Sequence, residues 1–210
     1  EDLQGTDLER LFNEELGAVL QVSRDNAAKI AAQFAIAGVP CHVLSHRDYP
    51  DRSSFDRAMA AAVDQYQPDL VILAGFMRIL TPEFTDHYAG RLLNIHPSLL
   101  PKHKGLDTHQ RALDAGDSEH GCSVHFVTSE LDGGPVIVQA RTAVLPEDNA
   151  VSLAQKVHQL EHQIYPLAAQ WFIDGRLQLG PQGAVLDGIE LPPGGQLFVA
   201  SQPSRSFLTC

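Results

Sequence analysis

Apolar runs of strand length alternate with amphipathic stretches of helix length along the first half of the chain. The runs Asp69–Ala74 (DLVILA) and Arg91–Ile95 (RLLNI) are almost continuously apolar, which is typical of parallel strands buried on both faces. Between such runs, apolar residues recur at three- and four-residue spacing, which predicts helices. The pattern predicts strands over Ala18–Val22, Pro40–Leu44, Asp69–Ala74 and Arg91–Ile95, and helices over Leu8–Leu16, Asn26–Ala37, Arg52–Gln65 and Pro82–Tyr88.

One long helix dominates the pattern of the second half. Asn149–Ile173 keeps helical spacing over its whole length and ends before Gly175, a residue type that commonly stops helices. Two short strand-like pieces after this glycine predict a small C-terminal hairpin. The other predicted elements are strands over Cys122–Thr128, Val136–Arg141, Arg176–Leu179 and Ala184–Leu186, a helix over Thr108–Ala115 and a turn over Pro192–Gly195.

Alternation of strands with helices is typical of a parallel sheet that has helices on both faces. We therefore predict an α/β fold with a doubly wound, mostly parallel sheet, a long C-terminal helix and a small C-terminal hairpin. No repeat or linker divides the chain, so 1–210 is predicted to be a single domain with segments 1–90, 91–175 and 176–210. Ligands of such sheets bind outside the carboxyl ends of the strands, where we expect the site.

Composition and charge narrow the classes of function. The chain has 210 residues, of which 44% are hydrophobic, enough to form a core. A formal net charge of −11 disfavours general binding to nucleic acid or to anionic membranes. No window reaches the roughly 18 apolar residues of a membrane span, and no signal peptide is evident. The distant cysteines Cys41, Cys122 and Cys210 favour a reducing, cytoplasmic setting over a disulfide scaffold.

Histidines are concentrated in the middle of the chain, which raises the question of a metal site. Six of them fall between His87 and His125. No H-x3-H or C-x2-C spacing occurs in this stretch, and Cys122 has no nearby partner cysteine. Zinc sites in proteins usually contain His or Cys ligands at such short spacings, which are missing here. We therefore expect neither a structural nor a catalytic metal.

Asn94 and His96 form the most informative polar pattern. Two residues apart in a predicted strand, they face the same side of the sheet at the strand's carboxyl end. An amide and an imidazole so placed can both donate hydrogen bonds to one oxygen, as an oxyanion stabiliser does. A structural polar pair is the more common explanation of an isolated Asn-x-His. Here Pro97 and Pro101 stiffen the following loop, which favours a fixed functional turn.

Asp132 is a candidate partner for His96. It precedes Gly133-Gly134-Pro135, a turn in which the backbone can approach a ligand closely. A carboxylate beside an imidazole raises the pKa of that imidazole and can accept a proton from an attacking amine. From the D-G-G pattern alone, an Asx-type turn is the favoured explanation.

Two further segments suit ligands of different kinds. Gly75–Leu80 follows a predicted buried strand and contains both apolar and basic residues. These residues either pack in the core or line a flat apolar ligand slot with Arg78 near its mouth. Gly5–Leu8 begins a predicted helix, and a glycine turn at a helix N-terminus can hold a phosphate. The Asp7 carboxylate would repel a phosphate bound there if it faced the anion. We predict that it points away.

Three blocks of the sequence resemble the phosphoribosylglycinamide formyltransferases, a family of folate-dependent enzymes of purine synthesis. They are Ala74–Leu80 (AGFMRIL), Gly90–Pro101 (GRLLNIHPSLLP) and His120–Pro135, and the resemblance extends from about Gly5 to Pro193. It implies a Rossmann-like formyltransferase fold, with a nucleotide-binding-like half over 1–90 and a catalytic and folate-binding half over 91–175. It also implies formyl transfer from 10-formyltetrahydrofolate to the amine of glycinamide ribonucleotide in de novo purine biosynthesis.

The resemblance implies roles for individual residues. The catalytic residues implied are Asn94, His96 and Asp132. The residues implied for the 10-formyltetrahydrofolate site are Arg52, Met77, Arg78, Ile79, Leu80, Asn94, Thr128, Ser129, Glu130, Leu131 and Asp132. The residues implied for the ribonucleotide are Gly5, Thr6 and Asp7 at its phosphate, His109 nearby and Glu161 at its ribose. The resemblance implies two small-molecule substrates, no nucleic acid, no membrane, no metal, and a monomer or weak homodimer.

Departures from the family pattern fall on the ribonucleotide side. The family begins with an apolar strand that leads into the phosphate loop, whereas Glu1–Gln4 stands in that place here. Asp7 replaces a neutral amide, and Asp107 stands where a histidine is common. The alternatives are therefore a formyltetrahydrofolate hydrolase, a formyltransferase acting on an amino-sugar nucleotide or a charged tRNA, and a folate-binding protein with an impaired phosphate loop. The net charge disfavours the tRNA.

Overall fold

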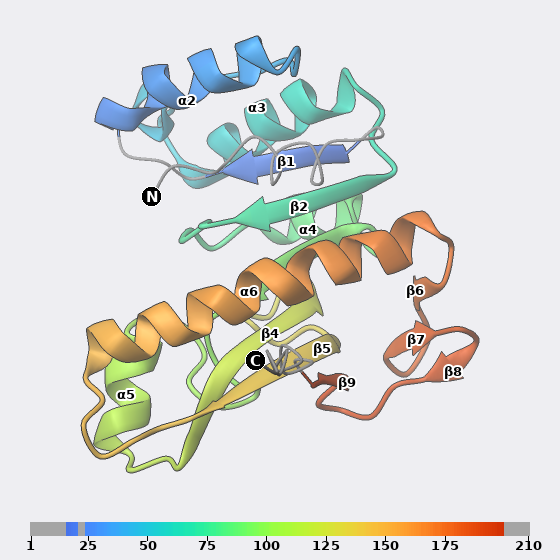
Figure 1. The fold of residues 1–210 in the computed structure, drawn as a ribbon. Helices are drawn as coiled ribbons and strands as arrows, with labels where there is room; N and C mark the ends of the chain where they lie inside the picture. The colour runs from blue at the N-terminus through green and yellow to red at the C-terminus, as the bar shows by residue number, and fades with distance from the viewer. Residues whose placement is uncertain (1–15, 21–23, 200–210) are drawn as a thin grey trace, which may run out of the picture.

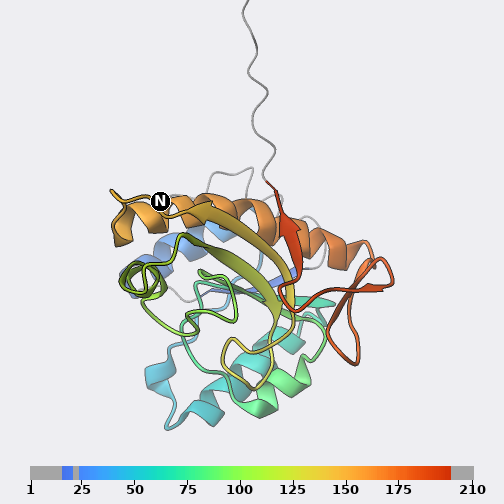
Figure 2. The same ribbon diagram turned by 90° about the horizontal axis from the view of Figure 1, so that it is seen from below.

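A mixed β-sheet with helices on both faces forms the centre of the chain (Figures 1 and 2). The computed structural model describes residues 16–20 and 24–199. Within these residues the strands of the main sheet, in spatial order, are β1 (Leu16–Leu20), β2 (Leu70–Ala74), β3 (Leu92–His96), β4 (Glu119–Phe126), β5 (Val136–Ala143) and β9 (Gln196–Phe198). The helices described are α2 (Arg24–Ile36), η1 (His46–Asp48, a 3-10 helix), α3 (Arg52–Asp64), α4 (Pro82–His87), α5 (Thr108–Asp114) and α6 (Ala150–Ile173).

The sheet is mostly parallel, as predicted. β1, β2 and β3 pair in parallel, and β9 pairs in parallel with β5. β4 pairs antiparallel with both β3 and β5, so the hairpin β4–β5 lies inside the sheet. An antiparallel pair needs no crossover helix, and a loop over 127–135 is enough to join these two strands. This loop starts beside the amino end of β3, because the Val127 N–H donates to the carbonyl of Leu92, the first residue of that strand, at 2.9 Å.

The central strands are buried on both faces, which explains their continuous apolar sequence. Leu70 and Ile72 of β2 belong to a core cluster with the buried side of α6, whereas Val71 and Leu73 belong to a second cluster with α3 and α4. Successive side chains of a strand point to opposite faces, so the run serves both clusters. Tyr165 of α6 donates its buried hydroxyl to carbonyls of β2 and β3, at 2.7 and 3.1 Å. This contact fixes the long helix across the sheet.

Side-chain caps explain where the helices begin. Thr81 caps α4, with Pro82 at the first helical position, and its hydroxyl accepts the Phe84 N–H at 3.4 Å. Asp51 caps α3 by accepting the Ser54 N–H at 2.7 Å. Asn149 begins α6 with a reciprocal capping box. Each cap satisfies backbone N–H groups that have no partner within the helix.

The predicted strand over Pro40–Leu44 is wrong. These residues form an irregular segment, and Cys41, His42 and Val43 are exposed. An apolar run becomes a strand only when a neighbour accepts its hydrogen bonds, and within the described residues β1 pairs with β2 alone. The predicted helix over Leu8–Leu16 lies outside the described residues except for its last position, which begins β1 instead.

The C-terminal segment contains more strand than predicted. The expected hairpin is present as β6 (Leu177–Leu179) and β7 (Ala184–Leu186), and β8 (Ile189–Glu190) extends it to a three-stranded sheet. The chain then turns at Pro193–Gly194 and enters β9. A Cβ on Gly195 would lie 2.6 Å from the Ile137 carbonyl, so only glycine allows this close approach to β5.

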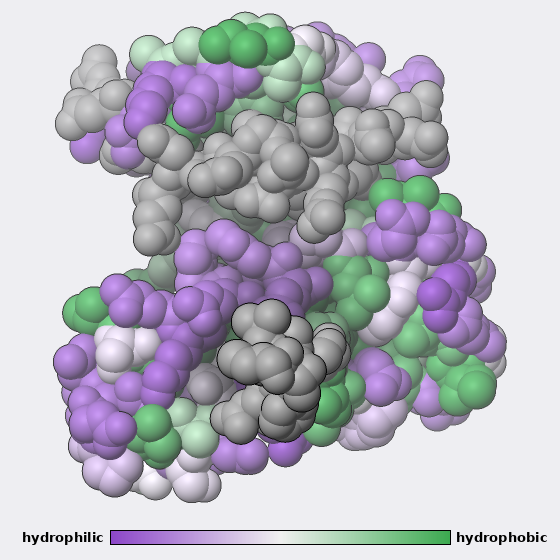
Figure 3. All heavy atoms as spheres, viewed as in Figure 1, coloured by the Kyte–Doolittle hydropathy of each residue, from purple (hydrophilic) through white to green (hydrophobic). Residues whose placement is uncertain are grey.

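The outer surface of the long helix is polar. Figure 3 shows hydrophilic side chains over much of α6, while apolar side chains form smaller groups elsewhere on the same face. The buried residues of α6, which include Leu153, Val157 and Ile164, lie on its other side. No helix in the described part of the chain is long and apolar enough to cross a membrane.

Candidate functional site

The structure brings His96 and Asp132 together at the carboxyl end of β3. His96 is the last residue of β3, and Asp132 lies in the β4–β5 loop. The His96 Nδ1 is 3.5 Å from the Asp132 Oδ2, and the two side chains are only 8% and 9% exposed. Charged and polar groups interact more strongly when water is excluded around them. The pair therefore has the geometry for proton transfer or for orienting the imidazole.

The turn that carries Asp132 is fixed by its neighbours. Asp132 has a left-handed φ of 45°, and its Oδ2 accepts the Gly105 N–H at 2.8 Å. A Cβ on Gly134 would collide with the Phe126 carbonyl, so glycine is required at this position. The Gly-Gly-Pro turn thus holds the carboxylate against the loop that follows β3. The Asp132 carboxylate thus bonds to a residue 27 positions earlier in the chain and also faces His96.

Asn94 joins the same cluster through His125. The two residues face each other in the antiparallel pair β3–β4. The His125 Nδ1–H donates to the Phe126 carbonyl at 2.8 Å, so Nε2 is the acceptor for the Asn94 amide at 3.2 Å. Burial lowers the pKa of His125, which favours this neutral form. His125 Nε2 also lies 3.8 Å from the Asp132 Oδ1, so this histidine touches two predicted site residues.

His125 is a site residue that sequence reasoning missed. It lies on the polar side of a predicted strand, where a structural role is the usual explanation. Only the register of β3 against β4 places it opposite Asn94. That register depends on tertiary contacts and is not encoded in the spacing of either segment.

The second ring nitrogen of His96 is also engaged. The His96 Nε2–H donates to the backbone carbonyl of His103 at 3.0 Å. His103 has a left-handed φ of 51°, which is uncommon for a residue with a side chain. The loop after β3 therefore folds back over the imidazole, and both of its nitrogens face acceptors.

The described residues of the predicted ribonucleotide site lie on α5 and α6. His109 Nδ1 and His120 Nε2 share a hydrogen bond of 3.1 Å. Burial lowers the pKa of His109, and it lowers the pKa of His120 to about 4. Burial raises the pKa of Glu161, which pairs with His158 at 3.2 Å. Gly5, Thr6 and Asp7 lie outside the described residues.

Most of the predicted folate residues lie on two segments, one after β2 and one in the β4–β5 loop. Met77 and Ile79 follow β2 and are 62% and 52% exposed, whereas Leu80 is buried. Arg78 lies over the Phe55 ring at 5.2 Å, and its buried Nε has no hydrogen-bond partner among the described residues. The second segment, Thr128–Leu131, begins the β4–β5 loop, where the exposed Leu131 adds apolar surface. Glu130 pairs with Lys104 at 2.7 Å, and Arg52 is exposed at the start of α3.

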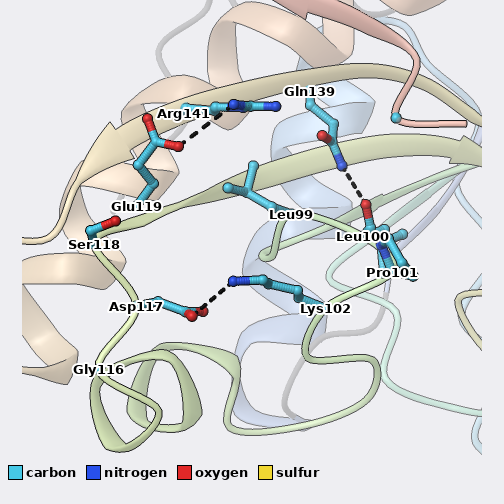
Figure 4. A pocket seen from close by; sticks show the side chains of 11 residues that line it. Leu99, Leu100, Pro101, Lys102, Gly116, Asp117, Ser118, Glu119, Gln139 and Arg141 are labelled. Carbon is cyan, nitrogen blue, oxygen red and sulfur yellow. Dashed lines mark hydrogen bonds and ion pairs between the residues drawn. The ribbon is translucent and has the colours of Figure 1, made fainter. Parts of the chain in front are cut away.

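A cavity of about 520 Å³ lies behind the loop that follows β3 (Figure 4). Its wall includes Leu99, Leu100, Lys102, Asp117, Gln139 and Arg141, and none of the predicted site residues that the structure describes. Gln139 is buried and donates to the Leu100 carbonyl at 2.8 Å and to the Ser123 hydroxyl at 2.9 Å. Part of the cavity wall is therefore formed by the loop after β3, whose next residue, His103, bonds to His96.

The described residues offer no metal centre. Among them, no group of three or more His, Cys, Asp or Glu side chains is arranged to hold a metal ion. The histidines that cluster in the sequence instead bond to one another, to backbone carbonyls or to carboxylates.

Proteins of known activity and solved structures resemble the chain over most of its length. It is 55% identical over 159 residues to the phosphoribosylglycinamide formyltransferase of Escherichia coli (strain K12), covering 76% of this chain and 75% of that protein. It is 46% identical to the Haemophilus influenzae protein of the same name, with the same coverage of both chains. The phosphoribosylglycinamide formyltransferase of Coxiella burnetii, solved in complex with CHES, superposes with a TM-score of 0.82 at 44% identity, covering 93% of this chain and 94% of that chain.

A second solved structure supports the same relationship. Glycinamide ribonucleotide transformylase 1 from Symbiobacterium toebii superposes with a TM-score of 0.77 at 35% identity, covering 87% of this chain and 89% of that chain. Residues 5–169 match the Formyl transferase family. This match includes the described elements from β1 to most of α6, and with them Asn94, His96 and Asp132. The chain therefore belongs to the formyl transferase family.

Proposed function

We propose that the chain transfers a formyl group from 10-formyltetrahydrofolate to the amine of glycinamide ribonucleotide, a step of de novo purine biosynthesis. The observation that carries the proposal is the cluster of Asn94, His96 and Asp132 at the carboxyl end of β3, with His96 and Asp132 3.5 Å apart and almost enclosed. The relatives that the chain resembles are named for this reaction.

In the proposed reaction, the neutral amine attacks the formyl carbon and a tetrahedral oxyanion forms. Asn94 and His96 are its proposed hydrogen-bond donors. One N–H of the Asn94 amide is directed to His125 at 3.2 Å, which leaves its second N–H to donate to the oxyanion. A preorganised donor of this kind typically lowers the barrier by about 2.7–4 kcal/mol. The transfer needs no covalent enzyme intermediate, because the carbon passes directly between two nitrogens.

Asp132 is the proposed carrier of the amine proton. Attack leaves an extra proton on the new amide nitrogen, and collapse of the intermediate breaks the bond between the formyl carbon and N10 of the folate. The proton must therefore move from the first nitrogen to N10. The Asp132 carboxylate, exposed only at its edge and 3.5 Å from His96, can pass it through water. The contact of Asp132 with the His96 Nδ1 orients the ring so that the His96 Nε2–H points towards an oxygen acceptor.

The proposed folate site lies between Met77–Leu80 and Thr128–Leu131. The exposed apolar side chains of Met77, Ile79 and Leu131 suit the faces of a flat ring. Because these side chains offer few polar atoms, the pterin is expected to bond mainly to backbone groups. Arg52 and Arg78 supply positive charge near this edge for the carboxylates of the folate tail.

The ribonucleotide is proposed to bind on the opposite side of His96, towards α5 and α6. Neutral His109 and the carboxylate of Glu161 suit hydroxyl groups of a ribose, because both accept hydrogen bonds. Gly5, Thr6 and Asp7 remain the proposed phosphate loop. We also propose that the protein acts in the cytoplasm on small molecules alone, as a monomer or weak homodimer. The free thiols of Cys41 and Cys122 and the net charge of −11 support this setting.

The experiment that tests the proposal separates transfer from hydrolysis. Purified protein is given 10-formyltetrahydrofolate with and without glycinamide ribonucleotide, and formylated ribonucleotide and free formate are both measured. We expect ribonucleotide-dependent transfer with little formate. Formate release that does not depend on the ribonucleotide would identify a hydrolase, and folate binding without either product would identify a binding protein.

A further inference from the structure

A half-buried pair of side chains, His103 and Asp117, lies next to the carbonyl that accepts the His96 hydrogen bond. The His103 Nε2 donates to the Asp117 Oδ2 at 2.8 Å, and the two side chains are 13% and 15% exposed. The same residue, His103, gives its backbone oxygen to the His96 Nε2–H at 3.0 Å. A chain of hydrogen bonds therefore runs from the half-buried Asp117 carboxylate through His103 to the imidazole of the candidate site.

The backbone of His103 is held in a conformation that needs support. A left-handed φ of 51° at a residue with a side chain has a steric cost, which persists only where the surroundings enforce it. The bond to Asp117 is a charge-assisted hydrogen bond, among the stronger kinds in proteins. Asp117 also accepts the Lys102 Nζ at 2.8 Å, and Figure 4 shows these two side chains facing each other at the wall of the cavity.

Other contacts fix the earlier part of the loop but not this residue. The Ser98 hydroxyl donates to the Lys102 carbonyl at 2.6 Å, and Gln139 holds the Leu100 carbonyl at 2.8 Å. Neither contact involves the His103 carbonyl oxygen itself, and the nearer one bonds to the Lys102 carbonyl of the preceding peptide. Among the described residues, the hydrogen bond of the His103 side chain goes to Asp117, and this bond restrains the residue whose carbonyl oxygen faces His96.

We propose that Asp117 and His103 act as a positioning pair for His96, by fixing the carbonyl oxygen that directs its Nε2–H. The inference rests on the proposed function, in which this N–H donates to the oxyanion. Before substrate binds, the His103 carbonyl keeps the donor in one direction. As the oxyanion forms, its greater negative charge competes for the same proton, and the donor is already in place. Asp117 and His103 touch neither substrate in this arrangement.

Kinetics of matched variants test the pair. His103→Ala removes the donor to Asp117, whereas His103→Gln keeps a side-chain N–H. We expect kcat to fall about tenfold in His103→Ala and in Asp117→Asn, with the KM of both substrates nearly unchanged, because the effect acts on a transition-state donor. His103→Gln should restore most of the loss. The matched control is Asp114→Asn, which removes an exposed carboxylate from α5 and should leave kcat unchanged.

Nitrogen NMR of the substrate-free protein tests the link to His96 independently of turnover. With 15N-labelled histidine, the His96 ring signals are assigned by their loss in His96→Gln. We expect His103→Ala and Asp117→Asn to shift the His96 Nε2 signal, and His103→Gln and Asp114→Asn to leave it in place. An unmoved signal in folded His103→Ala would overturn the proposal, as would equal loss of kcat in His103→Ala and His103→Gln.

The melting temperature of each variant shows whether it is folded. If Asp117→Asn fails to fold, the comparison of His103→Ala with His103→Gln decides, since both retain the Asp117–Lys102 bond. If the wild-type protein shows no formyl transfer, the proposed function fails. The NMR arm then still decides whether the pair controls the His96 ring.

Discussion

Replacing Asn94 by alanine should cost far more activity than stability. The change removes the N–H that is proposed to donate to the oxyanion, and loss of one such donor raises the barrier by about 2.7–4 kcal/mol. Since about 1.36 kcal/mol corresponds to a factor of ten, kcat should fall by about 10²–10³. Removal of the amide also leaves the buried Nε2 of His125 without its 3.2 Å partner. An unpaired buried acceptor typically costs about 1–3 kcal/mol of folding free energy.

Steady-state formyl transfer with both substrates, together with urea unfolding, measures the two effects separately. We expect the KM values to change little, because the lost interaction forms mainly in the transition state. The control is Gln110→Ala, which also removes an amide, in this case one that donates to Asp114 at 2.7 Å on the exposed side of α5. A folded Asn94→Ala protein whose kcat stays within about fivefold of wild type would refute the assignment of Asn94 as an oxyanion donor.

Three further predictions concern stability, pH and ligand binding. Tyr165→Phe removes the hydroxyl that donates to carbonyls of β2 and β3, and it should lower the free energy of unfolding by about 1–3 kcal/mol; an unchanged urea midpoint would contradict this. Native His120 has a pKa of about 4 against 6.5 for the unfolded side chain, so its contribution to stability is complete above pH 6.5 and is lost as the pH falls towards 4. The loss of stability over this interval should be smaller in His120→Gln, and equal slopes in both proteins would argue against the assignment. A folate analogue at about 100 times its dissociation constant should stabilise the native state by about 2.7 kcal/mol and raise the melting temperature, with a smaller rise in Leu131→Asp if the β4–β5 loop lines the site.

The contact between His96 and Asp132 could be predicted from the sequence, because local patterns place both residues. His96 ends an apolar run that forms a strand, and ligands gather at such ends. Gly133, Gly134 and Pro135 mark a turn between two predicted strands, and Asp132 stands directly before it. Both arguments use local patterns, as do the predictions of β2 and β3 from their apolar runs.

The contacts made by His125 and His103 depend on information that no local pattern contains. His125 reaches Asn94 through the register of β4 against β3. His103 reaches His96 because a loop adopts a left-handed conformation and folds back, which its own sequence does not require. The failure at Pro40–Leu44 has the same origin, since an apolar run forms a strand only if the sheet offers it an edge. The site is therefore predictable where it is local, and it needs the structure where segments meet.

The most direct test of the account is the rate of formyl transfer by Asp132→Asn, measured as ribonucleotide-dependent product from 10-formyltetrahydrofolate. Asparagine keeps the size of the side chain and an oxygen that can accept the Gly105 N–H, now made by the carboxylate at 2.8 Å, so the turn should be retained. It cannot carry a proton. The account predicts a folded protein that binds folate and has lost at least about 10²-fold of the wild-type kcat. A folded Asp132→Asn protein that turns over at close to the wild-type rate would contradict it.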